Sequence, residues 1–464
     1  MVFWRSSDDC SAVSSVSEDK KFTSFYSFIC VCKIEMRSVL ICTLGLVSMV
    51  TAWDPIWLQP EQVHLSATGD PTQMMVTWST FNDTKESTVE FGFQVENMTM
   101  TAYGSRTKFV DGGPEKHTQY IHRVTLTNLM PGLLYMYRCG SSYGWSSVFY
   151  FRALPSDPTP VGGIRLAVYG DMGNENAQSL GRLQVEAQSG MYDAILHVGD
   201  FAYDMENNNG RVGDEFMRQI ETAAAYVPYM TCPGNHENAY NFSNYKNRFT
   251  MPMYEEVQSL WYSWNIGTAH IISFSTEVNF YLEYGQDVIK NQMAWLQKDL
   301  QEATKPENRA KHPWIIAMGH KPMYCGFVKW FDCNELAGIV RTAYEDLFYK
   351  YGVDLYIGAH EHNYERMWPI YNNKIYNGSM DAPYTNPKAP VHIITGSAGN
   401  KEGQHFLLPP KPYTAFQTRD FGYTRFFILN STHIHAEQVS DDKGGQIIDK
   451  FTLIKNLHGP EAWL

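Results

Sequence analysis

Five apolar segments of the chain each end in a small residue followed by a side chain that can bind a metal ion. In open α/β sheets, binding sites form beyond the carboxyl ends of the strands, so we expect these side chains to meet at one sheet edge. Two further candidates, Tyr203 and His362, follow within three residues of the second and fifth segments. The segments are 164–171, 194–200, 229–235, 315–320 and 355–360, and they end in Asp171, Asp200, Asn235, His320 and His360.

The seven side chains comprise two carboxylates, one phenol, one amide and three imidazoles. Oxygen ligands suit hard cations, and imidazole suits Zn and Fe. Seven ligands exceed one tetrahedral site, but with Asp200 shared they divide into two sets of four. Two metal ions about 3.5–4 Å apart stabilise both the attacking and the leaving oxygen when a phosphoester is cleaved. We therefore predict a dinuclear phosphoesterase site.

Each motif alone has a commoner explanation. A Gly-Asp pair is usual in turns, and we interpret His197, His270 and His392 as core or supporting residues. What packing does not readily explain is the order Gly-Asp-x-Gly, Gly-Asp-x-x-Tyr, Gly-Asn-His-Glu, a strand-end His and His-x-His.

Two regions with different patterns position these residues. Residues 58–155 contain short strand-like runs separated by Gly, Pro, Asn and Asp, which predicts a β-sandwich. From 163 to 390, apolar runs alternate with helical patterns, which predicts βαβ units and a largely parallel sheet. Residues 391–455 return to strands, which we expect to complete the second sheet of the catalytic domain.

Residues 36–52 have the pattern of a secretory signal peptide, in which Arg37 precedes a short apolar run that ends at Ala52. We expect cleavage near Ala52 and interpret residues 1–35 as a gene-model extension. A type II anchor is the alternative, but the run is shorter than the roughly 20 residues that span a bilayer. The expected location is secreted/extracellular or lysosomal, without a stable membrane anchor.

Sequons and cysteines agree with secretion. Of the four cysteines after Ala52, Cys325 and Cys333 are close enough in sequence to form a disulfide loop, whereas we expect Cys139 and Cys232 to be buried free thiols. N-glycans are expected at the sequons Asn82, Asn97, Asn241, Asn377 and Asn430. The net charge of −12, without a Lys/Arg block, argues against a nucleic acid partner.

With these motifs in this order, the sequence resembles the metallophosphoesterases and, within them, the purple acid phosphatases, which the Tyr of the second motif distinguishes. The resemblance covers nearly all of the chain after Ala52, and the animal acid phosphatase type 7 group is most similar. It implies an α/β/β/α metallophosphoesterase sandwich preceded by an all-β fibronectin III-like sandwich. The matching motifs are Gly170–Gly173, Gly199–Tyr203, Gly234–Glu237, Ala317–His320 and Ala359–His362.

The resemblance also implies the cofactors, an Fe(III) ion and a divalent Fe, Zn or Mn ion. Asp200 would belong to both shells. The ferric ligands would be Asp171, Asp200, Tyr203 and His362. The divalent ligands would be Asp200, Asn235, His320 and His360.

The same resemblance implies how the site would act. Metal-bound hydroxide would be the nucleophile, and His236 would protonate the leaving alkoxide as general acid. Glu237 would orient His236 as a carboxylate orients a catalytic imidazole. Ionised Tyr203 on Fe(III) would give the purple colour.

The sequence departs from the family at Ala317, where Val is usual, and at Ala359, where Gly is usual. The His-rich substrate loop that follows the fourth motif in the plant enzymes of the family has no obvious counterpart, and the segment 325–333 occupies that region. Near it, Tyr324, Lys329 and Trp330 are candidates to line the pocket, although surface positions are equally compatible with the pattern.

The favoured function is therefore an acid phosphatase, a phosphoric monoester hydrolase acting on small phosphomonoesters or phosphoproteins. A phosphodiesterase or nucleotide pyrophosphatase with the same metals is the alternative. Two other hypotheses are an adhesion protein with an inactive catalytic domain and an iron-linked redox side activity.

Overall fold

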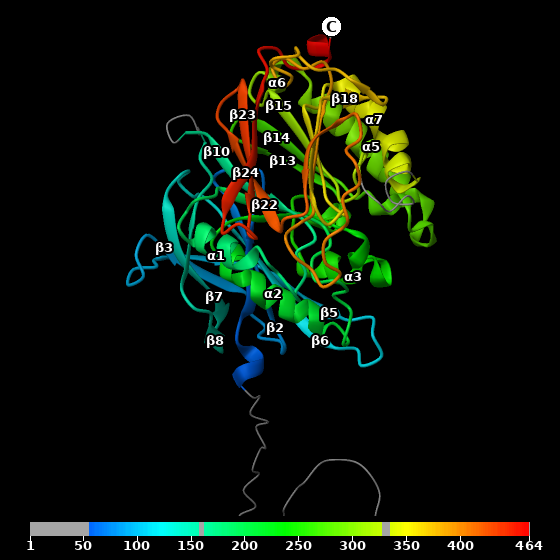
Figure 1. Cartoon of the computed structure of the whole chain (residues 1–464). Helices are drawn as coiled ribbons and strands as arrows, with labels where there is room; N and C mark the ends of the chain where they lie inside the picture. The colour runs from blue at the N-terminus through cyan, green and yellow to red at the C-terminus, as the bar shows by residue number, and fades with distance from the viewer. Residues whose placement is uncertain (1–54, 157–161, 327–334, 464) are drawn as a thin grey trace, which may run out of the picture. The chain divides into compact units, whose positions relative to one another are not determined.

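The computed structural model describes residues 55–156, 162–326 and 335–463 (Figure 1). The expected signal segment 36–52 lies outside the described residues, as do Lys329, Trp330 and Cys333. Residues 157–160 of the Pro-rich segment between the two predicted regions lie outside them as well.

The first region is an all-β sandwich of two antiparallel sheets. One sheet has the order β1-β2-β6-β5, and the other has the order β4-β3-β7-β8 with β9 also paired to β7. Trp78 from the first sheet and Val89 and Tyr137 from the second are buried in one core, which is why alternating apolar residues form these strands. The strands are β1 (Glu61–Ser66), β2 (Met74–Thr80), β3 (Thr88–Gly92), β4 (Met100–Tyr103), β5 (Ser105–Val110), β6 (Thr118–Leu126), β7 (Leu134–Ser141), β8 (Gly144–Trp145) and β9 (Phe149–Arg152).

The second region contains two mixed sheets instead of one largely parallel sheet. The six-stranded sheet has the order β12-β11-β10-β22-β23-β24, and the seven-stranded sheet has the order β13-β14-β15-β16-β20-β17-β21. The strands are β10 (Ile164–Tyr169), β11 (Ala194–Val198), β12 (Tyr229–Cys232), β13 (Tyr262–Ile266), β14 (Ala269–Ser273), β15 (Trp314–Met318), β16 (Leu355–Gly358), β17 (Tyr364–Met367), β20 (Val391–Thr395), β21 (Thr414–Thr418), β22 (Gly422–Ile428), β23 (His433–Ser440) and β24 (Gln446–Ile454), with β18 (Ile370–Tyr371) and β19 (Lys374–Ile375) as a separate hairpin.

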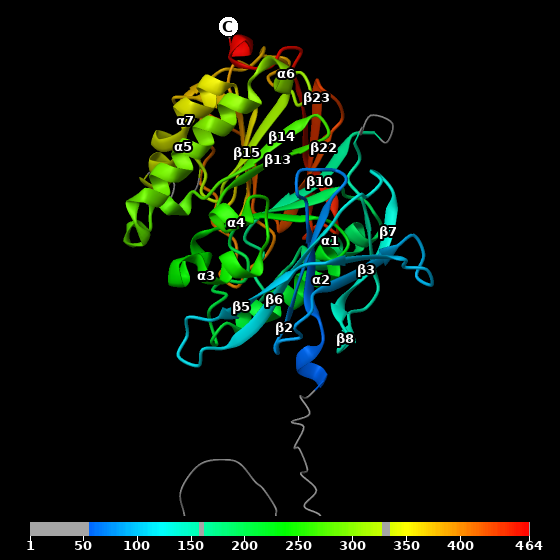
Figure 2. The ribbon, with the colours of Figure 1, turned by 180° about the vertical axis from the view of Figure 1, so that it is seen from behind.

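Helices cover the outer faces of both sheets (Figures 1 and 2). Phe216 of α2 packs 6.1 Å from the ring of His197 on β11, and Phe348 of α7 packs 6.2 Å from Tyr356 on β16. None of the described helices has the length and apolar character needed to cross a bilayer. The α-helices are α1 (Leu180–Gln188), α2 (Arg211–Ala224), α3 (Ala239–Arg248), α4 (Tyr254–Val257), α5 (Gln286–Ala303), α6 (Pro306–Arg309) and α7 (Ala337–Tyr351), and the 3-10 turns are η1 (Pro55–Leu58), η3 (Asn235–Glu237), η4 (Glu277–Asn279), η5 (Leu282–Tyr284) and η7 (Pro460–Trp463).

The expectation that all C-terminal strands complete the second sheet was wrong in part. β20 and β21 join the seven-stranded sheet, but β22 pairs antiparallel with β10 and brings β23 and β24 into the six-stranded sheet. Hydrogen bonds join the two sheets where these strands face each other, including Thr424 Oγ1 to Thr395 Oγ1 at 2.9 Å. The chain therefore closes the two-sheet core by returning to the strand with which the catalytic region began.

The sandwich contacts the catalytic region at a buried ion pair that belongs to the catalytic region. Arg248 at the end of α3 donates to Asp214 of α2 at 2.7 Å, and both side chains are almost fully buried. From the sandwich, Gln119 and His117 also contact Asp214, at 3.0 and 2.9 Å. Burial acts to raise the pKa of Asp214, but Arg248 and His117 outweigh burial and hold this pKa below its usual value.

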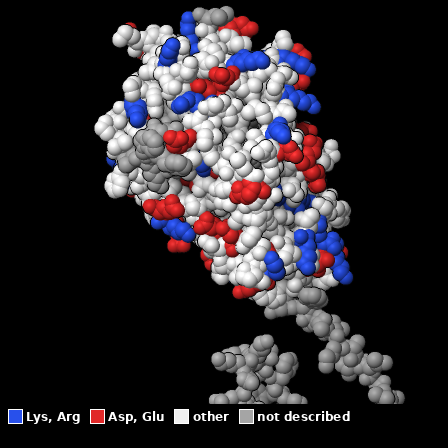
Figure 3. All heavy atoms as spheres, turned by 90° about the vertical axis from the view of Figure 1, so that its right-hand side faces the viewer, with Lys and Arg blue, Asp and Glu red and all other residues white. Residues whose placement is uncertain are grey.

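Charged side chains on the outer surface, unlike the buried pair of Arg248 and Asp214, are exposed to solvent. On the face drawn in Figure 3, basic and acidic side chains are interspersed among uncharged ones. Exposed pairs such as Lys290–Asp287, whose side chains are 71% and 88% exposed, contribute little stability.

Replacing Arg248 with Met is expected to lower the free energy of unfolding by about 3–5 kcal/mol at pH 7, because it leaves a buried carboxylate without its main partner. Because the pKa of Asp214 is lower in the folded than in the unfolded protein, ionised Asp214 stabilises the wild type at every pH above about 4, the unfolded value. This stabilisation is lost only as the pH falls through the lowered folded value. The penalty in the variant should therefore shrink on acidification, as the unpaired carboxyl takes up a proton. Urea unfolding at pH 7 and pH 4 measures both effects, with Lys290→Met as the exposed control. Equal, small changes in the two variants would contradict the prediction.

Candidate metal centre

The candidate ligands lie beyond the carboxyl ends of strands from both sheets. Asp171, Asp200 and Asn235 follow β10, β11 and β12, which are parallel neighbours in the six-stranded sheet. His320 and His360 follow β15 and β16 of the seven-stranded sheet. The sequence predicted a single edge, whereas the structure brings the edges of two facing sheets together.

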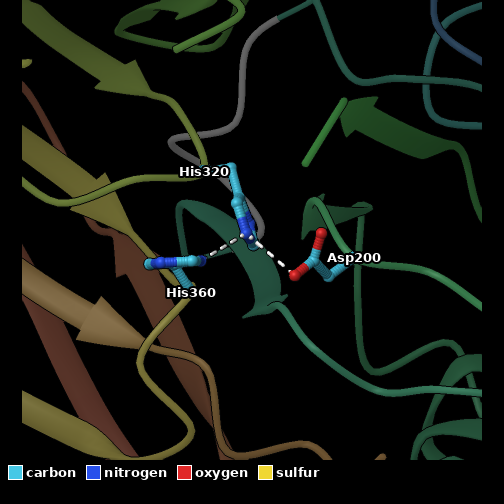
Figure 4. A group of neighbouring side chains, drawn as sticks. All are labelled: Asp200, His320 and His360. Carbon is cyan, nitrogen blue, oxygen red and sulfur yellow. Dashed lines mark hydrogen bonds and ion pairs between the residues drawn. The ribbon is translucent and has the colours of Figure 1, made fainter. Parts of the chain in front are cut away.

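One set of candidate ligands surrounds the Nε2 atom of His320. This atom lies 3.0 Å from Asp200 Oδ2, 3.2 Å from Asn235 Oδ1 and 3.3 Å from His360 Nδ1. In Figure 4, Asp200, His320 and His360 point toward one another from three different strand ends. Their ligand atoms all lie within 4.8 Å of one another, close enough to share one ion.

A second set brings together Asp171, Tyr203 and His362. The Tyr203 hydroxyl lies 3.2 Å from Asp171 Oδ1 and 2.8 Å from His362 Nε2. His362 Nε2 is also 3.6 Å from Asp171 Oδ1. These are the three ligands expected only for the ferric ion, and they form one cluster.

Two imidazole rings donate their Nδ1 protons to backbone carbonyl oxygens outside these clusters. His320 Nδ1 donates to the carbonyl oxygen of Val198 at 2.8 Å, and His362 Nδ1 donates to that of Gly403 at 2.7 Å. Since a carbonyl can only accept, each Nε2 of a neutral ring presents a lone pair to the site. Lone pairs of oxygen and nitrogen therefore converge at two points, an arrangement that fits two cations.

The charges of the site also fit bound cations. Burial raises the pKa of Asp171 well above its usual value. Burial, with the charges of Asp171 and Asp200, does the same for Tyr203. Ionised Asp171 and Tyr203 therefore need positive charge beside them, which a metal ion provides.

Backbone strain is concentrated at these ligands. Asp200, Tyr203 and His360 have φ values of 53°, 56° and 70°, in the left-handed region that bulky residues seldom adopt. The glycines before the ligands permit close packing: a Cβ on Gly234 would lie 2.2 Å from Asp200 Oδ1, and one on Gly199 would lie 2.6 Å from His320 Nδ1. Gly199 is thus required by the proximity of the two sheets, and Gly234 by that of the neighbouring loops after β11 and β12.

His236 lies beside both clusters and is partly exposed. Its Nδ1 pairs with Asp204 Oδ1 at 2.7 Å, while its Nε2 is 4.0 Å from Asp200 Oδ2 and 3.8 Å from Glu402 Oε1. Although burial acts to lower it, the carboxylates of Asp200 and Asp204 raise the pKa of His236 to about 10. The imidazole is therefore able to carry a proton at the mouth of the site.

The expectation that Glu237 orients His236 was wrong. Both carboxylate oxygens of Glu237 accept backbone N–H groups, from Gly234 and Asp200 at 2.8 and 2.9 Å and from Phe201 at 2.9 Å. Glu237 thus holds the backbones of two ligand loops together. Asp204 contacts the imidazole instead and occupies the orienting position. It directly follows Tyr203 of the second motif, and this adjacency is the sequence signal that could have identified it.

Other residues singled out from the sequence lie away from the clusters. His197 and His392 are buried, whereas His270 is partly exposed and pairs with Asp299 at 2.9 Å. Tyr324 is buried, with its hydroxyl on Glu345, and so is not part of an open pocket.

The cysteine predictions are tested in part by the described residues. Cys139 and Cys232 are buried free thiols, as expected. Cys325 is disulfide-bonded, while its predicted partner Cys333 lies outside the described residues.

Known proteins share both the sequence and this architecture. Residues 164–364 match the calcineurin-like phosphoesterases, residues 60–153 the N-terminal domain of purple acid phosphatases, and residues 389–450 the region described as iron/zinc purple acid phosphatase-like protein C. Acid phosphatase type 7 of Danio rerio is 54% identical over 88% of this chain and 94% of its own length. The human protein of that name is 54% identical over 87% of this chain and 93% of its own length.

A solved structure confirms the fold. The purple acid phosphatase PPD1 from yellow lupin (Lupinus luteus) seeds superposes with a TM-score of 0.70 at 24% identity, covering 85% of this chain and 74% of that chain. The predicted catalytic sandwich with an N-terminal β-sandwich is therefore confirmed. Together with the matches in sequence, this shows that the chain belongs to the purple acid phosphatase family.

Proposed function

We propose that this protein is an acid phosphatase that hydrolyses phosphate monoesters with an Fe(III) ion and a divalent ion. The observation that carries the proposal is the pair of lone-pair clusters, one around Tyr203 and one around His320, with His236 beside both. The seven proposed metal ligands are Asp171, Asp200, Tyr203, Asn235, His320, His360 and His362. The iron and zinc of the matching C-terminal family description agree with this donor set.

The proposed metal ions supply positive charge for the phosphoryl oxygens and a nucleophile drawn from water. The residues of the chain supply the rest. His236 holds a proton at Nε2, on the side of the ring that faces the clusters, and gives it to the leaving oxygen. Asp204 fixes the ring through Nδ1 and stabilises its charged form.

Secretion and glycosylation belong to the same proposal. The sequence pattern of residues 36–52 supports entry into the secretory pathway, with a secreted or lysosomal destination. The sequon residues Asn97, Asn241 and Asn430 are exposed, and Asn82 and Asn377 are partly exposed, as N-glycan attachment requires. A mass decrease after glycosidase treatment of the secreted protein would support attachment at these positions.

The first test is a visible spectrum with metal analysis of the purified protein. We expect a violet band and two metal ions per chain. Tyr203→Phe should lose the band while the divalent ion remains bound, because the phenolate contacts only the proposed ferric ion. Tyr262→Phe is the matched control, since its buried hydroxyl donates to Thr231 instead. A chain without bound metal would overturn the proposal.

The second test concerns proton donation. His236→Ala should lower kcat on an alkyl phosphate by about 10²–10⁴-fold, and less on a nitrophenyl phosphate, whose leaving group needs no proton. Asp204→Asn should lower kcat by a smaller factor, because the ring remains but loses its orienting carboxylate. An unchanged kcat of His236→Ala at acidic pH would contradict the general-acid role. Parallel assays on a phosphodiester and a nucleoside triphosphate distinguish the alternative activity, which faster hydrolysis of those substrates would favour.

A further inference from the structure

A buried lysine that no motif singles out lies next to the proposed divalent site. Lys321 directly follows His320, and only 3% of its surface is exposed. Its Nζ atom donates to Asn235 Oδ1 at 3.0 Å and to Glu277 Oε2 at 2.8 Å. Glu277 is fully buried, so the pair lies in the protein interior.

This lysine is well placed to fix the orientation of the Asn235 amide. An amide presents an oxygen on one side and an NH2 group of similar size on the other, and only the oxygen can bind a metal ion. His320 Nε2 lies 3.2 Å from the same oxygen, but in the neutral ring that binds a metal ion the proton is on Nδ1, so Nε2 does not donate. Among the described residues, Lys321 is therefore the donor that selects the oxygen.

We propose that Lys321 is a positioning residue, which holds Oδ1 of Asn235 toward the divalent ion. This inference rests on the proposed metal centre. An amide oxygen has two lone pairs, so it can accept from Lys321 and still bind an ion. A flipped amide would direct its NH2 group at an ammonium that has no lone pair.

Glu277 makes this arrangement compatible with a nearby metal ion. A lone ammonium 3.0 Å from a ligand atom would repel the cation that the ligand binds. The carboxylate of Glu277 offsets that charge and is itself held by the hydroxyl of Thr276 at 2.9 Å. The backbone N–H of Lys321 donates to the same hydroxyl at 2.9 Å, so lysine and glutamate are fixed to one anchor.

The chain offers a matched control for the loss of a buried lysine. Lys455 is 1% exposed and pairs with the fully buried Asp354, as Lys321 pairs with Glu277. Lys455 donates to no candidate metal ligand among the described residues. Lys455→Met therefore reports the effect of breaking a buried lysine–carboxylate pair without touching Asn235.

The experiment compares zinc affinity and iron content in purified full-length variants. Zn(II) is titrated into protein that retains iron, against a competing chelator, and the violet band is recorded. Lys321→Met should weaken Zn(II) binding by about 10–100-fold, the usual effect of losing a group that orients a ligand. The iron content and the band should stay at the wild-type level, because Lys321 contacts no proposed ligand unique to the ferric ion.

Two further variants test the assignment. Lys321→Arg should restore most of the zinc affinity, since a guanidinium also donates to the amide. Lys455→Met should unfold at a lower temperature but bind Zn(II) as the wild type does. Unchanged zinc affinity in Lys321→Met, or equal loss of both metals in Lys321→Met and Lys455→Met, would overturn the inference. If the wild type itself holds iron but no second ion, the proposed divalent site fails along with this role for Lys321.

Discussion

The structure depends on holding lone pairs and negative charges together inside the protein, where they repel one another. Asp171, Tyr203 and His362 converge at one point, and a second set converges around His320. In a buried site such repulsion is not screened by water, so the surrounding framework must be rigid. The left-handed backbone at Asp200, Tyr203 and His360 shows that the framework imposes this geometry on residues that would otherwise avoid it.

Rigidity comes from two sources that are far apart in the sequence. The two sheets share one hydrophobic core, and a hydrogen bond between Thr424 and Thr395 joins them near the site. The β-sandwich adds support from the other side, because Arg248 ends the helix that follows the Asn235–Glu237 turn. Its ion pair with Asp214, contacted by residues of the sandwich, places the sandwich behind one of the ligand loops. The sandwich is therefore a separate domain that also stabilises the catalytic region.

Residues next to apolar strands were predictable from the sequence, and residues that act through others were not. Asp171 and Asp200 follow neighbouring parallel strands, β10 and β11, whose carboxyl ends meet at one sheet edge, so their proximity followed from the strand pattern. The number of sheets could not be predicted in this way. β22 pairs with β10 across more than half of the chain, and no local pattern reveals that pairing. Glu237 was misassigned because its neighbour in sequence is His236, whereas its carboxylate turns back to the Asp200 loop. Lys321 was overlooked because burial of its charge depends on a partner, Glu277, from another segment.

The ligand sets also explain why the two sheets belong together. The cluster around His320 includes Asp200 and Asn235 from the six-stranded sheet and His360 from the seven-stranded sheet. The cluster around Tyr203 likewise joins the loops after β10 and β11 to His362, which follows β16. An ion bound by either set would therefore link the sheets, and because the unfolded chain has no such set, binding would stabilise their packing. The fold must overcome charge repulsion to assemble the site, and the same concentration of negative charge and lone pairs gives the site its affinity for cations. A bound metal would therefore stabilise the packing of the two sheets and also supply the catalytic chemistry.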